Sequence, residues 1–183
     1  TRCPSAALTL PGGIPYKDED GSWLDPYNSM TADYLTELCT ELADMGFDEL
    51  LLKNLAMPQT DATLAYTVQL SSVPNPVSAV CSLAIDLISQ LESRDVLVSA
   101  ILDTTSLRSG LSAQSGQDLS VFAKLFDRLC CSADTVWRAT VDRDSVDYWM
   151  YEGDLSLRFV PIFPFADSGN FSCWIYKVPE GML

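Results

Sequence analysis

The residues of this sequence that could do chemistry come at the ends of its apolar runs. They are Lys53 and Asn54 after residues 50–52, Asp103 and Thr104 after residues 96–102, Arg138 and Asp142 within and after residues 135–141, and Asp167 beyond residues 157–163. The carboxyl ends of parallel strands meet at one edge of a sheet, where barrel enzymes carry their working residues. Asp103 and Asp142 could form a pair of carboxylates there, one acting as an acid and the other as a base or nucleophile.

Each of these residues also has a structural interpretation. Aspartates at strand ends commonly cap the next helix or turn, and this applies to both Asp103 and Asp142. A lysine at the end of a buried strand has to reach solvent or pair with an acid. Lys53 is therefore expected to form an ion pair with a neighbouring strand-end aspartate. Schiff-base chemistry on a desolvated lysine is the chemical alternative.

Aromatic residues make a further candidate group. Trp149 and Tyr151, close to Tyr148 and Trp137, could stack on a sugar ring or cover the end of the sheet. The candidate ligand-binding residues are therefore Lys53, Asn54, Arg138, Trp149 and Tyr151.

The composition excludes several classes of site and partner. The sequence has no histidine, so it contains no Ser-His or Cys-His nucleophile. Its six cysteines form no CxxC pair, and the acidic turn at residues 18–21 lacks the remaining ligands of a calcium loop, so we expect neither a metal nor a cofactor. A net charge of −14 argues against nucleic acid. No run of about eighteen apolar residues is present to span a membrane.

Alternating helix and strand patterns must position the candidate residues. Helices are expected from residue 28 or 29 up to Gly46, from residue 76 to residue 91, and over residues 119–130 and 145–154. Strands are expected over residues 48–54, 96–102, 135–141, 157–163 and 171–178. Asn28 or Ser29 can cap the first helix, Asn75-Pro76 is typical of a helix N-terminus, and Gly46 is typical of a helix C-terminus. Uninterrupted apolar strands that alternate with amphipathic helices favour a parallel sheet with flanking helices.

One stretch of the sequence resembles a known family. It contains WLDPYN at residues 23–28, Tyr34-Leu35 in the expected helix, GFDEL at residues 46–50, and Met57-Pro58 after the strand. Over these residues the sequence resembles the bacterial putative glycosyl hydrolase domain family, TIM-barrel proteins related to α-glycosidases. The resemblance implies a glycosidase-like barrel.

The sequence departs from that family where the family places its chemistry. The family's strand typically continues with an aspartate, an aromatic residue and later Arg-Phe-Pro, whereas Lys53, Asn54 and Ala56-Met57 stand at those positions here. That aspartate holds the position of the nucleophile in related glycosidases, so the resemblance implies that this chain lacks it. Glycoside hydrolysis needs two carboxylates, which Asp103 and Asp142 would have to supply from other strands.

The length of the chain bounds how much of such a barrel it can form. A complete (β/α)₈ barrel needs about 250 residues, and this sequence has 183 and reaches the family's middle-of-barrel motif at Trp23. We therefore expect that about the first three β/α units are absent. The predicted fold is α/β, a partial (β/α)₈ TIM barrel of roughly the C-terminal half to five-eighths, with parallel strands and flanking helices. Residues 1–183 would form one domain, with residues 1–24 mostly loop.

Three hypotheses about function follow. The first is a degenerate barrel that has lost its nucleophile, has no hydrolytic activity by itself, and binds a glycan or no ligand at all. The second is an active glycoside hydrolase with relocated carboxylates and part of its site in a missing N-terminal region. The third is a non-catalytic scaffold, whose open strand edges favour self-association or pairing with that missing half. The expected partner is a carbohydrate. The resemblance places the protein outside the cytoplasm or at the cell envelope, whereas Cys39, Cys81 and Cys130, expected as buried free thiols on helix faces, equally fit the cytoplasm.

Overall fold

The computed structural model has an α/β architecture built on one parallel sheet. The structure describes residues 3–66, 75–132, 158–163 and 175–176. Five strands lie side by side in sequence order, and all neighbouring pairs are parallel: β5 (Glu49–Leu52), β6 (Leu97–Leu102), β7 (Arg128–Ser132), β8 (Phe159–Phe163) and β9 (Ile175–Tyr176). The predicted α/β class with parallel strands is therefore confirmed.

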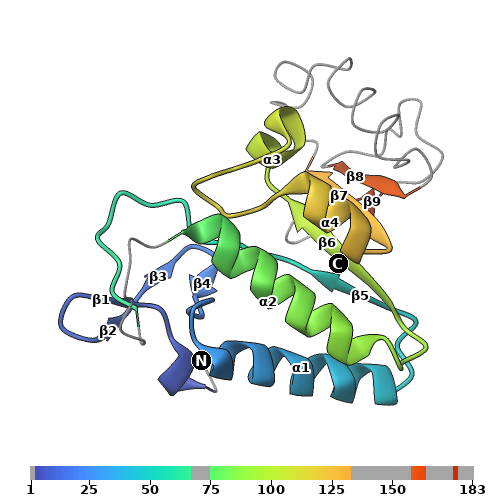
Figure 1. The fold of residues 1–183 in the computed structure, drawn as a ribbon, viewed down its shortest axis with the longest axis horizontal. Coiled ribbons are helices and arrows are strands. Elements are labelled where there is room, and N and C mark those ends of the chain that lie inside the picture. Colours follow the sequence, from blue (N-terminus) through green and yellow to red (C-terminus); the bar gives the residue numbers. More distant parts are fainter. Residues whose placement is uncertain (1–2, 67–74, 133–157, 164–174, 177–183) are drawn as a thin grey trace.

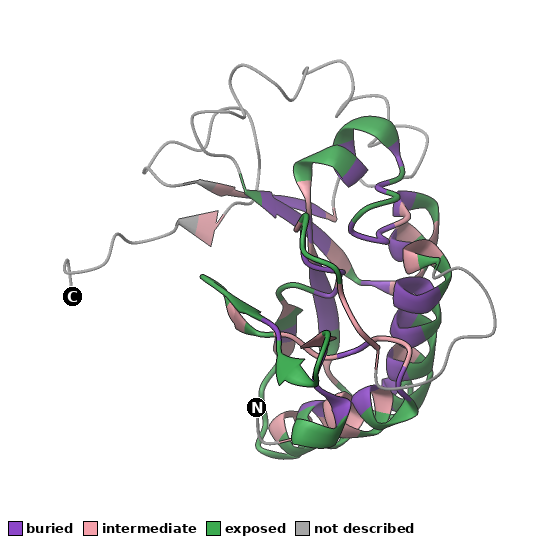
Figure 2. Cartoon of the chain, turned by 90° about the vertical axis from the view of Figure 1, so that its left-hand side faces the viewer, coloured by how far each residue is buried: buried purple, intermediate pink, exposed green. Residues whose placement is uncertain are grey.

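Three helices lie on one face of this sheet (Figures 1 and 2). They are α1 (Ser29–Asp44), α2 (Pro76–Leu91) and α4 (Leu119–Leu125), and the short α3 (Thr104–Ser109) follows β6. The two long helices begin where the sequence predicts, because the Asn28 side chain accepts the Met30 N–H and the Asn75 side chain accepts the Ser78 N–H. Gly46 follows α1 with a φ of 90°, which glycine adopts without strain. None of the helices in the described part of the chain combines the length and hydropathy that crossing a bilayer requires.

The core lies between these helices and the sheet. In Figure 2 the buried residues occupy the strands and the inward faces of the helices. Among its most completely buried members are Val80 and Leu87 of α2, Ala100 of β6, Phe122 of α4, and the nearby Phe126 and Leu129. Full burial of one large apolar side chain contributes about 1.5–3 kcal/mol. This layer is therefore the main source of the fold's stability.

Residues 3–24 form two small hairpins at the end of the sheet towards which β5 runs (Figure 1). After the 3₁₀ turn η1 (Pro4–Ala6), β1 (Thr9–Leu10) pairs with β2 (Ile14–Pro15), and β3 (Lys17–Asp18) pairs with β4 (Gly21–Ser22), both antiparallel. Within the segment predicted as a turn, residues 18–21, Glu19 and Asp20 connect β3 to β4. The N-terminal segment that the sequence predicts as mostly loop thus forms two hairpins.

The prediction of a helix over residues 119–130 is wrong in its second half. The helix α4 ends at Leu125, and Phe126 is already extended, with φ −99° and ψ 143°. The Asp127 N–H then donates to the Val98 carbonyl, and the Asp127 carboxylate accepts the Val98 N–H. These two hydrogen bonds place the chain beside β6, so residues 128–132 form a strand.

This change also moves the third strand of the sheet. The strand that pairs with both β6 and β8 is β7, whereas the sequence predicts residues 135–141, which lie outside the described residues. The apolar run at residues 129–131 is too short for its periodicity to distinguish a helix from a strand. Asp142 is therefore not the residue that ends this third strand.

Candidate functional site

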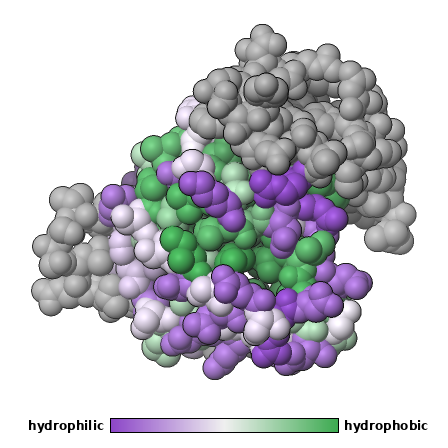
Figure 3. Space-filling model, turned by 45° about the vertical axis from the view of Figure 1, so that its right-hand side comes forward, coloured by the Kyte–Doolittle hydropathy of each residue, from purple (hydrophilic) through white to green (hydrophobic). Residues whose placement is uncertain are grey.

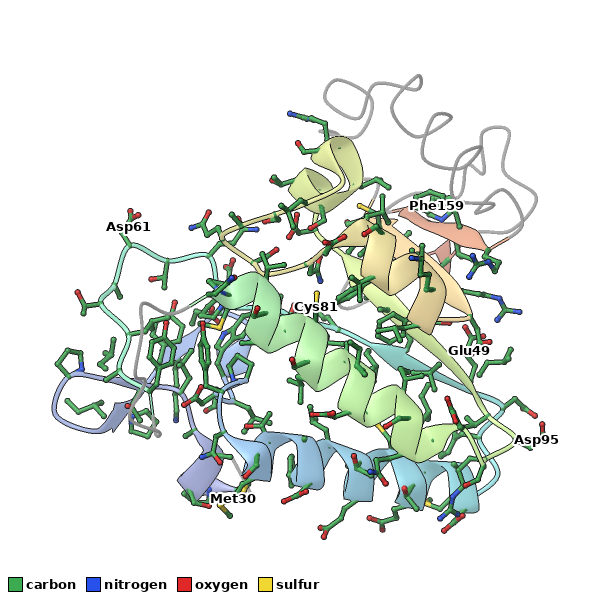
Figure 4. All side chains as sticks on the ribbon, in the orientation of Figure 1. Met30, Glu49, Asp61, Cys81, Asp95 and Phe159 are labelled. Atoms are coloured by element: carbon green, nitrogen blue, oxygen red, sulfur yellow. The ribbon has the colours of Figure 1, made fainter. Side chains whose placement is uncertain are left out.

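A cleft with mainly polar side chains lies between the β3–β4 hairpin and the carboxyl ends of β5 and β6. This polar cleft has a volume of about 490 Å³. Its carboxylates, amides and aromatic rings belong to Asp18, Glu19, Asp20, Asp103, Asn54, Gln59, Gln117, Tyr16 and Trp23. Figure 4 shows which way the strands run. The strands β5 and β6 begin near Glu49 and Asp95, and the loop after β5, which contains Asp61, lies at the opposite end of the molecule. The cleft thus occupies the edge at which parallel α/β proteins bind ligands.

Asp103 ends β6 and lines the polar cleft, but protein donors occupy its carboxylate. It is the N-cap of α3, and its Oδ1 accepts the Ser106 N–H at 2.7 Å. Its Oδ2 accepts the Ser106 hydroxyl at 3.1 Å and also the Ser115 hydroxyl. The predicted capping role of Asp103 is therefore confirmed, and these three donors do not favour a role as an acid or base.

Gln117 connects the two strand ends beneath the polar cleft. Its side chain is buried, and its Nε2 donates to the Leu55 carbonyl at 3.2 Å and to the Ile101 carbonyl at 3.1 Å. Its Oε1 accepts the Asp103 N–H at 2.8 Å. A buried amide is stable only when its hydrogen bonds are made, and here these bonds fix the spacing between the ends of β5 and β6.

Lys53 follows β5 and pairs with an acid, as predicted, but the acid belongs to the hairpin and not to a neighbouring strand end. Its Nζ lies 2.5 Å from Asp20 Oδ1, and the lysine side chain is 62% exposed. In the same hairpin, Asp18 accepts the Trp23 indole N–H at 2.8 Å and the Asp20 N–H at 2.9 Å. The ion pair joins the hairpin to the end of β5, and the Asp18 bonds hold the hairpin and the adjacent Trp23 in place.

Asn54, next to Lys53, has a left-handed backbone. Its φ of 60° is the only positive φ among the described residues other than glycine. Asparagine tolerates this conformation better than most residues, but the conformation still costs free energy. It turns the chain directly after β5, so that Asn54 lines the polar cleft and a second, adjoining cavity.

The second cavity is smaller and mainly apolar. This apolar cavity has a volume of about 290 Å³ and lies between α1, α2 and the end of β5. Its apolar wall is formed by Leu24, Leu35, Leu52, Leu55, Val80, Leu83 and Leu87. It shares Asp20, Trp23, Asn54 and Ala56 with the polar cleft. The two spaces are therefore neighbours separated by these four residues.

The WLDPYN residues hold the hairpins against the start of α1. Asp25 is fully buried, its Oδ1 accepts the Tyr27 N–H at 2.9 Å, and its carbonyl accepts the Thr31 hydroxyl at 2.6 Å. The Tyr27 ring meets Tyr66 edge to face with ring centroids 4.8 Å apart. Burial, with smaller contributions from Tyr66 and Asp25, raises the pKa of Tyr27 to about 12. This part of the motif therefore serves the scaffold.

Cys39 and Cys81 are free thiols, as predicted. Cys39 and Cys81 are buried on α1 and α2, and Cys81 Sγ lies 3.9 Å from the Gly116 carbonyl (Figure 4). Burial raises the pKa of both thiols, which makes them poor nucleophiles. Cys130 is also buried, but it lies on β7 and not on the predicted helix.

Only part of the predicted site can be placed. Asn54 and Asp103 line the polar cleft, and Lys53 lines the apolar cavity. The other predicted residues, Arg138, Asp142, Trp149, Tyr151 and Asp167, lie outside the described residues. Sequence reasoning missed the hairpin carboxylates and Gln117, and the acidic turn at residues 18–21 was the one signal that could have pointed to them. Within the described ranges, no group of three or more acidic or cysteine side chains is arranged to hold a metal ion.

Comparisons with known proteins agree with this architecture. A structural search matches the glycoside hydrolase domain of PgaB (BpsB) from Bordetella bronchiseptica with a TM-score of 0.55 and 14% sequence identity. The match covers 85% of this chain and 52% of that one, so this chain spans about half the length of the matched structure. A search of curated proteins found no match. The model of one family, described as a putative glycosyl hydrolase domain, matches residues 2–133, and this chain belongs to that family.

Proposed function

We propose that this chain is a glycosidase-like domain that binds carbohydrate in the polar cleft and does not hydrolyse it by itself. The observation that carries the proposal is the ion pair between Lys53 and Asp20, because it puts a cation where the family resemblance expects the nucleophile. Glycoside cleavage passes through an oxocarbenium-like transition state. At that position Lys53 supplies neither of the two carboxylates that hydrolysis needs, and its charge is paired with Asp20.

The side chains of the polar cleft support carbohydrate binding. Sugar hydroxyls are donors and acceptors at once, and the cleft offers acceptors on Glu19 together with both kinds of group on Gln59. Trp23 and Tyr16 add flat apolar surface for a sugar ring. We also propose that the sheet is an arc of a (β/α)₈ barrel, which would place this cleft on the barrel's functional face.

Hydrolysis assays test the absence of activity. We expect no turnover of aryl glycosides or of common α- and β-glucans by the purified protein. Lys53→Ala should stay inactive, because it supplies no acid, and Lys53→Asp should reach trace activity at most, because it supplies one of two groups. Robust turnover that Asp103→Asn or Asp142→Asn abolishes would contradict the proposal and favour a hydrolase with relocated carboxylates. Circular dichroism must show that Asp103→Asn is folded, since Asp103 caps α3.

Binding needs a separate measurement. Titration calorimetry against a panel of soluble oligosaccharides should detect a ligand, and Gln59→Ala should weaken it because Gln59 is exposed and lines the polar cleft. Gln90→Ala is the matched control, an exposed glutamine at the end of α2 that lines none of the described cavities. Equal loss of affinity in both variants, or no binding by any sugar of the panel, would count against a glycan site in this cleft.

Assembly is a second candidate function, supported by the edge of the sheet. Within the described residues β5 is an end strand of the sheet, and Leu51 on it is 42% exposed, with Leu97 of β6 at 40%. Figure 3 shows a continuous hydrophobic area on the face of the molecule that is turned towards the viewer. Open strand edges favour pairing with another chain, and we propose a second copy of this chain as the occupant. Light scattering that gives a clean monomer at tens of micromolar would exclude this assembly.

A further inference from the structure

The apolar cavity has no role in the binding of a plain sugar. Seven large aliphatic side chains form its wall, and two of its polar groups are already engaged. The Thr31 hydroxyl donates to the Asp25 carbonyl at 2.6 Å, and the Lys53 ammonium pairs with Asp20. A space lined in this way offers sugar hydroxyls few partners and is suited to an apolar group, because burying an unpaired hydroxyl costs free energy.

The position of the cavity connects it to the polar cleft. Asp20, Trp23, Asn54 and Ala56 line both spaces, so a ligand that fills one of them lies against the boundary of the other. Trp23 is fixed at that boundary, because its indole N–H donates to Asp18 at 2.8 Å. A ligand that occupies both spaces would therefore be polar at one end and apolar at the other.

We infer that the polar cleft and the apolar cavity form one bipartite site for a sugar that carries a short aliphatic substituent. The sugar lies in the cleft and the aliphatic chain lies in the cavity. This inference rests on the proposed glycan-binding function and names its ligand class. The volume of about 290 Å³ is at the small end of the range of ligand pockets, roughly 300–1,000 Å³. It suits one short chain and not the two long chains of a membrane lipid.

A series of ligands with growing chains tests this inference. The ligands are the methyl, butyl, hexyl and octyl glycosides of the sugar bound in the oligosaccharide panel, with the alkyl glucosides and maltosides as the default set. They are titrated below their critical micelle concentrations. Affinity should rise about fourfold for each added methylene, because each one leaves water for an apolar site. The rise should stop at the chain length that fills the cavity. Vesicles that contain a two-chain glycolipid should not bind.

The outcomes separate this inference from the proposed function. If the free sugar binds and the affinity is independent of chain length, the bipartite site is wrong while glycan binding stands. If hexanol binds but no sugar does, glycan binding fails and the bipartite site fails with it. A rise that continues without limit, or binding to glycolipid vesicles alone, would show that the chain inserts elsewhere and would also overturn the inference.

Variants that shrink the cavity sharpen the test. Leu35→Phe enlarges a half-buried side chain of the cavity wall, so the rise in affinity should stop at a shorter chain than in the wild type. Leu38→Phe is the matched control, the same change on the same helix at a residue that is 40% exposed and lines none of the described cavities. Ser22→Leu, at an exposed residue of β4 that lines only the apolar cavity, repeats the test without changing a helix. If none of these variants changes the chain-length dependence, the cavity does not hold the chain.

Discussion

Two regions of this molecule are held together by different kinds of contact. On the scaffold side, α2 and α4 pack on β6 and β7 through fully buried residues such as Val80, Leu87 and Phe122. On the cleft side, the β3–β4 hairpin meets the end of β5 through the partly exposed ion pair of Lys53 with Asp20. Packed apolar layers lose stability with each altered side chain, whereas exposed pairs contribute little. The difference suggests that the cleft side can change its chemistry at small cost to the fold, which fits a lysine in place of the family's aspartate.

The largest expected effect is on the scaffold side. Phe122→Ala should lower the free energy of unfolding by about 3–5 kcal/mol, because it empties a fully buried site between α4 and the sheet. Urea denaturation followed by circular dichroism measures this loss. Leu111→Ala, at a residue that is 43% exposed, is the control and should change stability little. Similar losses in both variants would mean that the scaffold is not packed as described.

The loop that joins the two regions should show the next largest effect. A Cβ on Gly116 would lie 2.4 Å from the Pro76 carbonyl oxygen, and Gly116 has a φ of 81°. Gly46 has a similar φ of 90° but open space around it. Gly46→Ala should therefore cost roughly 1–2 kcal/mol from backbone strain alone, and Gly116→Ala should cost about 1–3 kcal/mol more from the clash. Equal costs in urea denaturation would contradict the close approach of the loop to α2.

The cleft-side ion pair should contribute much less. Lys53→Ala should change the free energy of unfolding by only about 0–1 kcal/mol, because the pair is exposed to water. Arg94→Ala, which breaks the exposed pair of Arg94 with Asp44, provides a matched comparison. The small difference from wild type should shrink further in 1 M salt. A loss as large as that of Phe122→Ala would show that the hairpin belongs to the scaffold after all.

The smallest effect at neutral pH is expected at Tyr27. Its hydroxyl is buried without a hydrogen-bond partner among the described residues, so Tyr27→Phe should be nearly neutral at pH 7. The pKa of Tyr27 is raised from 10.0 to about 12 in the folded protein. The resulting stabilisation is complete below pH 10 and is lost as the pH rises through about 12. Wild type should therefore lose stability more steeply than Tyr27→Phe between pH 10 and pH 12, and parallel pH profiles of thermal unfolding would contradict this.

The long helices were predictable because their signals are local. The side chains of Asn28 and Asn75 cap backbone groups two and three residues away, and Gly46 ends α1 through its own backbone. The third strand was not predictable in the same way. Residues 129–131 become part of β7 because Asp127 pairs with Val98, a contact across 29 residues that no local pattern contains.

The same distinction between local and long-range contacts applies to the candidate site. The sequence alone determined that polar residues follow the apolar runs, so Lys53, Asn54 and Asp103 were correctly expected at strand ends. It also determined that the chain turns within residues 18–21, where Glu19 and Asp20 connect β3 to β4. Only the tertiary structure decided that this turn lies against the end of β5, so that Asp20 pairs with Lys53 across 33 residues. Only the tertiary structure decided that Gln117 joins the ends of β5 and β6. The physical reason is that local spacing specifies which residues can cap or turn, whereas long-range pairing is chosen by how the packed layers bring distant segments together.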